Sequence, residues 1–301
     1  MSNFFESRLA EWKEQIDERL EKLVGELHYA EPFKEVLRYA LFPGGKRLRP
    51  ILTLELHSLF CPPDEYALDY ACGIEMLHSY SLIHDDMPCM DNDDYRRDKL
   101  TVHKRYGEGV ALLAGDALLD LSYRILSCPM PDGKSSPFIG YSGAGGDMGL
   151  IRGQYSDLYG EITSLDELFK MYDFKTGALI RLACDSGYAL GNRSRVSVVG
   201  GDLGRTFTVS AHEEVDESAI IDSLRVNDFA RAFGRAFQLY DDISEYLEGL
   251  SIGERSVLKF LDLDDAKKEL NLMLNNAAKK LDLLGGDTRF LNELVQKFVI
   301  V

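Results

Sequence analysis

Apolar residues recur at helical spacing along almost the whole of this 301-residue chain. Steps of three and four residues place side chains on one face of a helix, and the first such stripe is Leu9, Trp12, Ile16, Leu20, Leu23 and Leu27. Breakers separate many of the further stretches, which cover residues 33–41, 46–60, 64–86, 108–127, 137–160, 164–190, 219–248, 262–284 and 287–299. The pattern predicts an all-α fold with one large domain over residues 1–301, whose long helices surround a central active-site cavity.

One segment departs from the helical pattern. Residues 195–209 read RVSVVGGDLGRTFTV, with β-branched residues on both sides of a glycine-rich centre. Such clusters predict a small β-hairpin inserted between helices. An irregular loop is the alternative that the sequence leaves open.

Composition excludes several classes of protein. Apolar residues make up 45% of the chain and charged residues 28%, which excludes a disordered chain. We expect no membrane span, because no apolar run reaches about 18 residues, and no secretory signal at the N-terminus. Five scattered cysteines without a CxxC pair indicate reduced thiols in a cytoplasmic protein. A net charge of −16 argues against nucleic-acid binding.

The densest group of functional side chains lies at residues 84–98, HDDMPCMDNDDYRRD, where six aspartates fall within fourteen residues. The preceding stretch is apolar and predicts a buried helix, which is costly to end in adjacent carboxylates unless a cation neutralises them. Pro88 interrupts the helix, so that the chain can bulge and bring Asp91 back beside Asp85. Carboxylates at this density favour Mg²⁺, which binds through a few carboxylates and substrate phosphates.

Basic residues accompany these aspartates. Arg96 and Arg97 follow them directly, and paired guanidinium groups next to metal carboxylates indicate a site for a phosphate ester. The segment GGKRLRP at residues 44–50 opens another helix with three bases, although acids are preferred there. This arrangement favours a bound anion, with a basic surface turn as the alternative. It is not a Walker loop, since the required spacing is missing.

A second acidic group, DDISE, occupies residues 241–245. Asp241 and Glu245 are four residues apart and share a helix face. Alone, this pattern is common on helix surfaces, but with the first group it predicts two acidic helix ends that face each other across a cavity. Weaker signals are GQYSD at 153–157 and Lys175 within an apolar helix, for which a snorkelling lysine is the alternative.

Together these segments resemble the trans-isoprenyl diphosphate synthases, the polyprenyl synthetase family. The resemblance runs from about residue 40 to 250, and the step from Asp85 to Asp91 is similar to that of bacterial short-chain farnesyl and geranylgeranyl diphosphate synthases. It implies a Mg²⁺-dependent head-to-tail condensation of isopentenyl diphosphate with an allylic diphosphate, dimethylallyl or geranyl diphosphate. It also implies an all-α fold that is normally a homodimer.

The resemblance assigns roles by position. For about three Mg²⁺ ions with substrate bound, it implies the ligands Asp85, Asp86, Asp91, Asp241, Asp242 and Glu245. The allylic diphosphate would be bound by Arg96 and Lys175, and isopentenyl diphosphate by Lys46, Arg49, His78 and Arg97. Thr176 and Gln238 would lie beside the developing carbocation, which makes the catalytic set Lys175, Thr176 and Gln238.

Product length is implied by the residues four and five positions before the first aspartate, Ser81 and Tyr80. In the family these residues form the floor of the pocket for the growing tail. A tyrosine there would stop growth near C15, so we predict farnesyl diphosphate as product and keep geranylgeranyl diphosphate, C20, open. The alternative is that Tyr80 simply packs in the core.

The sequence departs from the family pattern in three places. Glu245 stands where the second acidic motif usually ends in aspartate. The loop at 249–258 is shorter than in the family and lacks its lysine, unless Arg255 substitutes. The insertion at 195–218 is longer than the usual turn.

These departures leave two hypotheses. The leading one is an active prenyltransferase of the farnesyl diphosphate synthase type. The alternative is a degenerate paralogue without synthase activity, acting as a regulatory subunit or a prenyl-diphosphate binder. A terpene cyclase is disfavoured, because it would have no use for isopentenyl diphosphate ligands.

Overall fold

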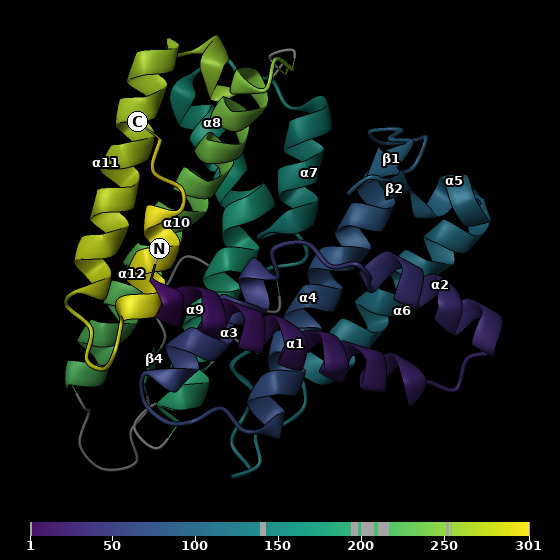
Figure 1. Cartoon of the computed structure of the whole chain (residues 1–301), viewed down its shortest axis with the longest axis horizontal. Coiled ribbons are helices and arrows are strands. Elements are labelled where there is room, and N and C mark those ends of the chain that lie inside the picture. The colour runs from purple at the N-terminus through teal and green to yellow at the C-terminus, as the bar shows by residue number, and fades with distance from the viewer. Residues whose placement is uncertain are drawn as a thin grey trace.

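The computed structural model describes residues 2–138, 143–193, 198–199, 208–209, 217–250, 253 and 255–300. Helices account for most of them, which confirms the all-α prediction (Figure 1). The α-helices are α1 (Asn3–Gly25), α2 (Glu31–Leu41), α3 (Leu48–Ser58), α4 (Glu65–Asp85), α5 (Val102–Tyr106), α6 (Glu108–Leu126), α7 (Leu150–Tyr159), α8 (Leu165–Tyr172), α9 (Ala178–Gly191), α10 (Glu217–Leu247), α11 (Leu263–Leu281) and α12 (Arg289–Gln296). The shorter elements are the π-helix η2 (Asp173–Gly177), the 3-10 helix η3 (Val257–Lys259), and the strands β1 (Tyr95–Arg96), β2 (Lys99–Leu100), β3 (Val198–Val199) and β4 (Thr208–Val209).

Helix α4 lies at the centre of the molecule. It contacts α1, α2, α3, α6 and α9, and most of its side chains are buried, as its apolar sequence predicts. Helix α1 crosses the front of this core in Figure 1 and buries one stripe that includes Trp12, Ile16 and Leu20. Helices α10 and α11 contact each other at the left of the same view. No helix in the described part of the chain is long and apolar enough to span a bilayer.

One helix prediction is wrong in its starting residue, and another has the expected bounds within one residue but covers three helical elements. The helix expected over 137–160 begins only at Leu150, because Gly143, Gly145, Gly146 and Gly149 favour the turns that precede α7. The helix expected over 164–190 is divided into α8, η2 and α9. The predicted hairpin at 195–209 is confirmed by antiparallel pairing of β3 with β4, and the residues between these strands lie outside the described residues.

The sequence did not reveal a second hairpin, β1–β2, which follows the aspartate-rich segment. Its strands pair antiparallel, with Arg96 opposite Lys99. The two residues of the turn, Arg97 and Asp98, have φ values of 53° and 62°. Two positive φ angles in a two-residue connection define a type I′ turn, in which Asn and Gly are preferred. The turn therefore contains two residues in a conformation that L side chains rarely adopt.

We expect Asp98→Gly to stabilise the protein by about 0.5–1 kcal/mol, because glycine adopts this conformation without a steric penalty. For a chain of this size the melting temperature should rise by roughly 1–3 °C in a calorimetric scan. Asp98→Ala is the matched control, since alanine retains the Cβ atom and should lower the melting temperature. An equal rise in both variants would contradict this interpretation of the turn.

Candidate functional site

The first acidic group lies at the C-terminal end of α4. The helix ends at Asp85, and the chain turns back so that the backbone N–H of Asp91 donates to the carbonyl of Asp85 at 2.9 Å. A second turn bond joins Asn92 N–H to the carbonyl of Met87 at 3.1 Å. The predicted bulge after the helix is therefore present, and it brings Asp91 beside Asp85.

Asp85 occupies an electrostatically unfavourable position. Burial raises its pKa to about 7, with nearby Asp91 contributing, while Lys175 opposes the shift. The C-terminus of a helix carries partial negative charge, which also disfavours a carboxylate there. The carboxylate of Asp85 is thus incompletely neutralised by the described residues, which is the condition that a bound cation relieves.

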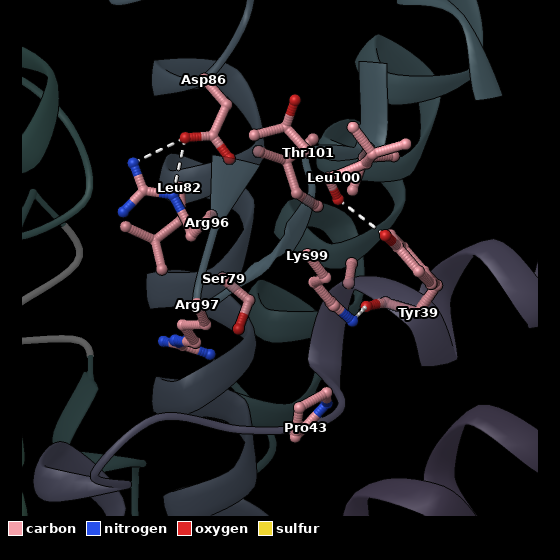
Figure 2. Close-up of a pocket in the computed structure, with 13 residues that line it drawn as sticks. Tyr39, Pro43, Ser79, Leu82, Asp86, Arg96, Arg97, Lys99, Leu100 and Thr101 are labelled. Carbon is pink, nitrogen blue, oxygen red and sulfur yellow. Dashed lines mark hydrogen bonds and ion pairs between the residues drawn. The ribbon is translucent and has the colours of Figure 1, made fainter. Parts of the chain in front are cut away.

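Asp86 differs from its neighbour because it already has a cationic partner. Its carboxylate accepts a hydrogen bond at 2.6 Å from Arg96 Nε, and Asp86 is buried (Figure 2). Arg96 also lies 3.5 Å from Asp93. Figure 2 shows Arg97 pointing away from this pair, along α4. An ideal Cβ at Gly45 would lie 2.8 Å from Arg97 Nη2, so the guanidinium lies close against the loop before α3 and would have to shift if Gly45 carried a side chain.

Two arginines of the basic segment before α3 differ in their hydrogen bonding. Arg47 is buried and donates to Asp17 and Glu75, each at 2.8 Å. Arg49 is also buried, but its Nε has no hydrogen-bond partner among the described residues. Burial lowers the pKa of Arg49, with Asp241 and Glu75 opposing. A buried guanidinium Nε without a partner favours an anion site, as the sequence predicts for Arg49.

Lys46 extends toward the second acidic group. Its Nζ lies 4.0 Å from Asp241 Oδ1, and it lies 5.3–5.6 Å from the ring centres of Phe237, Tyr240 and Phe298. Cation–π attraction of this kind is worth roughly 0.5–1 kcal/mol at exposed sites. Lys46 therefore places the basic loop beside the 241–245 motif, a proximity that the sequence did not predict.

The second acidic group projects from α10. Burial raises the pKa of Asp241 to about 6, while Lys46 opposes the shift and Glu245 adds to it. Asp242 differs, because it accepts hydrogen bonds from the Tyr172 hydroxyl at 2.5 Å and the Val257 N–H at 2.7 Å. Tyr172 also donates to the carbonyl of Arg255 at 3.3 Å. Asp242 thus anchors the shortened loop to α8 and α10.

We expect Tyr172→Phe to destabilise the protein by about 1–2 kcal/mol, because it leaves the buried Asp242 without its hydroxyl donor. The midpoint of urea unfolding should fall, and amide exchange should become faster at Val257. Tyr155→Phe serves as control, since Tyr155 is 66% exposed and its hydroxyl is in solvent. Equal midpoints for the two variants would remove the anchoring role.

The π-helix η2 contributes the catalytic candidates on the other side of the site. A π-turn shifts the helical phase, and such turns are frequent at functional sites. Lys175 Nζ forms an ion pair with Asp157. The Thr176 hydroxyl donates to Gln238 Oε1 at 2.8 Å, which joins η2 to α10. The predicted catalytic residues Thr176 and Gln238 are therefore in direct contact.

These elements surround a cavity of about 540 Å³. Seven predicted site residues line it, namely Arg49, His78, Tyr80, Ser81, Asp85, Lys175 and Thr176. Most of the remaining wall is apolar, including Leu119, Leu150 and Leu158. The predicted site residues that do not line this cavity lie on elements next to it. Arg255 is directed elsewhere, since its Nη2 donates to the carbonyl of Gly160 at 3.3 Å.

Four residues that lie in or next to the site were not assigned a role from the sequence. Asp157 pairs with Lys175, Tyr172 anchors Asp242, and Gln154 and His84 line the cavity. Both amide atoms of Gln154 are buried without a partner among the described residues. The GQYSD segment was the signal for Gln154 and Asp157. Tyr172 gave none, because it sits in an ordinary amphipathic helix.

The carboxylates of the two acidic groups can hold Mg²⁺ only if substrate phosphates supply further ligands. Within the described ranges, no three His, Cys, Asp or Glu side chains lie close enough together to hold a metal ion by themselves. Mg²⁺ usually takes one or two carboxylates and completes its coordination with phosphates and water. Burial raises the pKa of Asp85 to about 7 and that of Asp241 to about 6, so a cation bound at either carboxylate would be stabilising.

Comparison with known proteins adds independent findings. The family model described as Polyprenyl synthetase matches residues 30–267. A dimethylallyltranstransferase of Fischerella ambigua is 39% identical over 246 residues, which are 79% of this chain and 64% of that protein. A farnesyl diphosphate synthase of Geobacillus stearothermophilus is 32% identical over 312 residues, 96% of each chain. The solved apo structure of an FPP/GFPP synthase from Zymomonas mobilis superposes with a TM-score of 0.79 at 29% identity, covering 100% of both chains.

Proposed function

Because this chain belongs to the polyprenyl synthetase family, we propose that this prenyltransferase condenses isopentenyl diphosphate head to tail with dimethylallyl or geranyl diphosphate and requires Mg²⁺. The proposal rests on the cavity, which is lined by Asp85, Lys175 and Thr176 together with Arg49 and His78. Acidic residues, basic residues and an apolar wall in one cavity suit a substrate with a charged head and a hydrocarbon tail.

The proposed allylic diphosphate site lies between the two acidic groups. Asp85 and Asp91 on one side, and Asp241 and Glu245 on the other, are the proposed Mg²⁺ ligands. Bound Mg²⁺ would stabilise the negative charge of the leaving diphosphate. We assign Asp86 to positioning Arg96, and Asp242 to anchoring the loop before η3, because their oxygens already accept these hydrogen bonds.

Thr176 and Gln238 would stabilise the positive charge that develops when the allylic C–O bond breaks. The Gln238 amide is fixed at both ends, since its Oε1 accepts from Thr176 and its Nε2 donates to Asp242 at 3.3 Å. A fixed dipole costs no reorganisation during the reaction. Lys175, which lowers the pKa of Asp85 by its charge, would bind the diphosphate.

Isopentenyl diphosphate would bind on the basic side, with Lys46, Arg49 and Arg97 contacting its phosphates. His78 lines the cavity next to Arg49, and burial together with the surrounding arginines keeps its pKa well below the ordinary value. His78 is therefore neutral near pH 7 and suited to hydrogen bonding. A protein base is not required, because the released diphosphate can accept the final proton.

The experiment that tests this function is a product assay. Purified protein is incubated with Mg²⁺, isopentenyl diphosphate and, in separate reactions, dimethylallyl, geranyl or farnesyl diphosphate, and products are identified by mass. We expect C15 as the main product from dimethylallyl and geranyl diphosphate. Condensation with none of the three primers would favour the alternative, a regulatory subunit or prenyl-diphosphate binder.

Two features favour that alternative enough to keep it as a second candidate. Glu245 extends one methylene further than aspartate, and Arg255 bonds to Gly160 rather than replacing the missing loop lysine. Binding of farnesyl diphosphate without turnover would be its signature in a calorimetric titration. Retention of Arg49, Lys175 and both arginines of the β1–β2 hairpin favours activity.

We expect Glu245→Asp to lower the Mg²⁺ concentration for half-maximal activity by about threefold, because the shorter side chain brings its carboxylate to the usual distance from α10. A Mg²⁺ titration at saturating substrates measures this. Glu248→Asp is the control, since Glu248 lies on the exposed end after α10. A higher Mg²⁺ requirement in Glu245→Asp would show that this site is adapted to glutamate.

The proposed assembly is a homodimer. Helix α6 exposes two adjacent leucines, Leu112 with 46% and Leu113 with 59% of its surface accessible. Adjacent exposed leucines on one helix support an interface between copies of the chain. Sedimentation equilibrium tests the proposal, and Leu113→Lys should shift the protein toward monomers.

A further inference from the structure

His84, which directly precedes Asp85, has no role in the function proposed above. Its ring packs edge to face on the ring of Tyr80, one turn earlier on α4, with centroids 5.8 Å apart and an interplanar angle of 87°. Its Nε2 lies 3.2 Å from the carbonyl of Leu112 on α6. Both rings line the cavity. His84 thus fills the space between the proposed floor residue and α6.

The opposing residue on α6 is Gly115. An ideal Cβ at this position would lie 2.1 Å from His84 Nε2 and 2.4 Å from Cδ2, which is shorter than any tolerated contact. Glycine in a helix interior costs about 1 kcal/mol relative to alanine, so a buried glycine within α6 indicates a packing requirement. The requirement here is the imidazole ring.

We propose that His84 and Gly115 are a specificity-determining pair, in which the glycine provides room for the imidazole and the imidazole fixes Tyr80 and the width of the cavity beside it. The proposal rests on the proposed function, since product length is its main readout. Among the described residues, the one polar contact of Tyr80 is its hydroxyl at 3.4 Å from the carbonyl of Gly145. Edge-to-face packing by His84 is therefore one of the contacts that hold the Tyr80 ring, which also belongs to the hydrophobic core.

The geometry predicts opposite effects of two single substitutions. His84→Ala removes the ring, frees Tyr80 to move and widens the cavity, so longer products should increase. Gly115→Ala places a methyl group where the ring lies, and the cavity is the open space into which the ring can move. Longer products should then decrease. In the double variant the new methyl group meets no ring, so the product distribution should resemble that of His84→Ala.

The test compares four proteins, the wild type, His84→Ala, Gly115→Ala and the double variant, with Mg²⁺, isopentenyl diphosphate and geranyl diphosphate. We expect the C20 to C15 ratio to rise about tenfold in His84→Ala and to fall about tenfold in Gly115→Ala, since one carbon group in an apolar pocket discriminates by about this factor. The double variant should lie within about threefold of His84→Ala. Gly109→Ala, on the same helix but facing open space among the described residues, is the matched control and should change nothing.

Two outcomes would overturn the proposal. One is an unchanged ratio in His84→Ala, and the other is a double variant that retains the product pattern of Gly115→Ala. Melting temperatures show whether Gly115→Ala folds, and if it does not, His84→Ala and the double variant decide the question.

A binding experiment separates failure of this inference from failure of the proposed function. Calorimetric titration with dimethylallyl and farnesyl diphosphate requires no turnover. Gly115→Ala should weaken farnesyl diphosphate binding about tenfold and leave dimethylallyl diphosphate unaffected, because only the longer tail reaches the deep part of the cavity. Equal effects on both ligands would contradict the pair as a length determinant even in an inactive protein.

Discussion

Replacement of Asp85 by asparagine is expected to lower kcat/KM by at least about 1000-fold, which corresponds to about 4 kcal/mol of transition-state stabilisation. The carboxylate lies at the end of α4 on the cavity wall, next to Lys175 and Asp91. Asparagine retains the shape of the side chain but removes the charge that would attract Mg²⁺. Steady-state kinetics with geranyl and isopentenyl diphosphate measure the loss. Asp94→Asn is the matched control, because Asp94 lies in the same segment but pairs with Lys104 at the surface.

The same substitution should stabilise the protein when Mg²⁺ and substrate are absent. Asp85 ionises near 3.8 in the unfolded chain and near 7 in the folded protein. Between these values the unfolded state releases its proton first, so stability falls as the pH rises from about 4 to about 7 and stays low above. Asp85→Asn has no ionisable group at this position, so its stability does not fall in this way as the pH rises. Its melting temperature should exceed that of the wild type at pH 8, and the difference should narrow toward pH 4.5.

This pairing of results distinguishes a functional carboxylate from a structural one. A structural Asp85 would lose activity and stability together. Retention of full turnover in Asp85→Asn would exclude it from Mg²⁺ binding. Greater stability with lost turnover is the pattern expected when a fold tolerates an unfavourable charge for function.

The sequence predicted the parts of this site that depend on local pattern. Periodicity located the core helices, and Pro88 predicted the return of Asp91 to Asp85. Local pattern does not decide which partner a carboxylate takes. Asp86 and Asp242 are predicted metal ligands like their neighbours, but Asp86 accepts a hydrogen bond from Arg96, ten residues further on, and Asp242 accepts one from Tyr172 on a distant helix. Such assignments depend on tertiary contacts.

Backbone details escaped prediction for a related reason. The β1–β2 hairpin turns at Arg97 and Asp98, which carry no Gly or Asn signal. Its conformation directs Arg97 toward Gly45, a contact between segments that are far apart in the sequence. The helix expected before Leu150 is absent because several glycines precede that residue, and glycine favours turns over helix. In the hairpin a tertiary contact overrides local propensity, whereas before Leu150 one local signal, glycine, overrides another, apolar spacing.

Tyr80→Ala is expected to change the main product from C15 to C20 or longer. The Tyr80 ring is 5% exposed and lines the cavity with Ser81 and His84. Its removal opens space at the end where a growing tail would otherwise stop. One added isoprene unit needs several methylene-sized spaces, so the C20 to C15 ratio should rise by more than about tenfold. Product analysis by mass, with geranyl diphosphate as primer, measures it.

Tyr80→Phe is the control for the ring. It removes only the hydroxyl contact with Gly145 and should leave the product at C15. If Tyr80 were instead a simple core residue, Tyr80→Ala would cost about 3–5 kcal/mol of stability and leave product length unchanged. The pocket interpretation predicts a smaller loss, because the ring faces an existing cavity rather than close-packed neighbours on all sides. Unchanged products together with a large drop in the urea midpoint would therefore reject Tyr80 as the floor, and with it the role of His84 in restraining Tyr80.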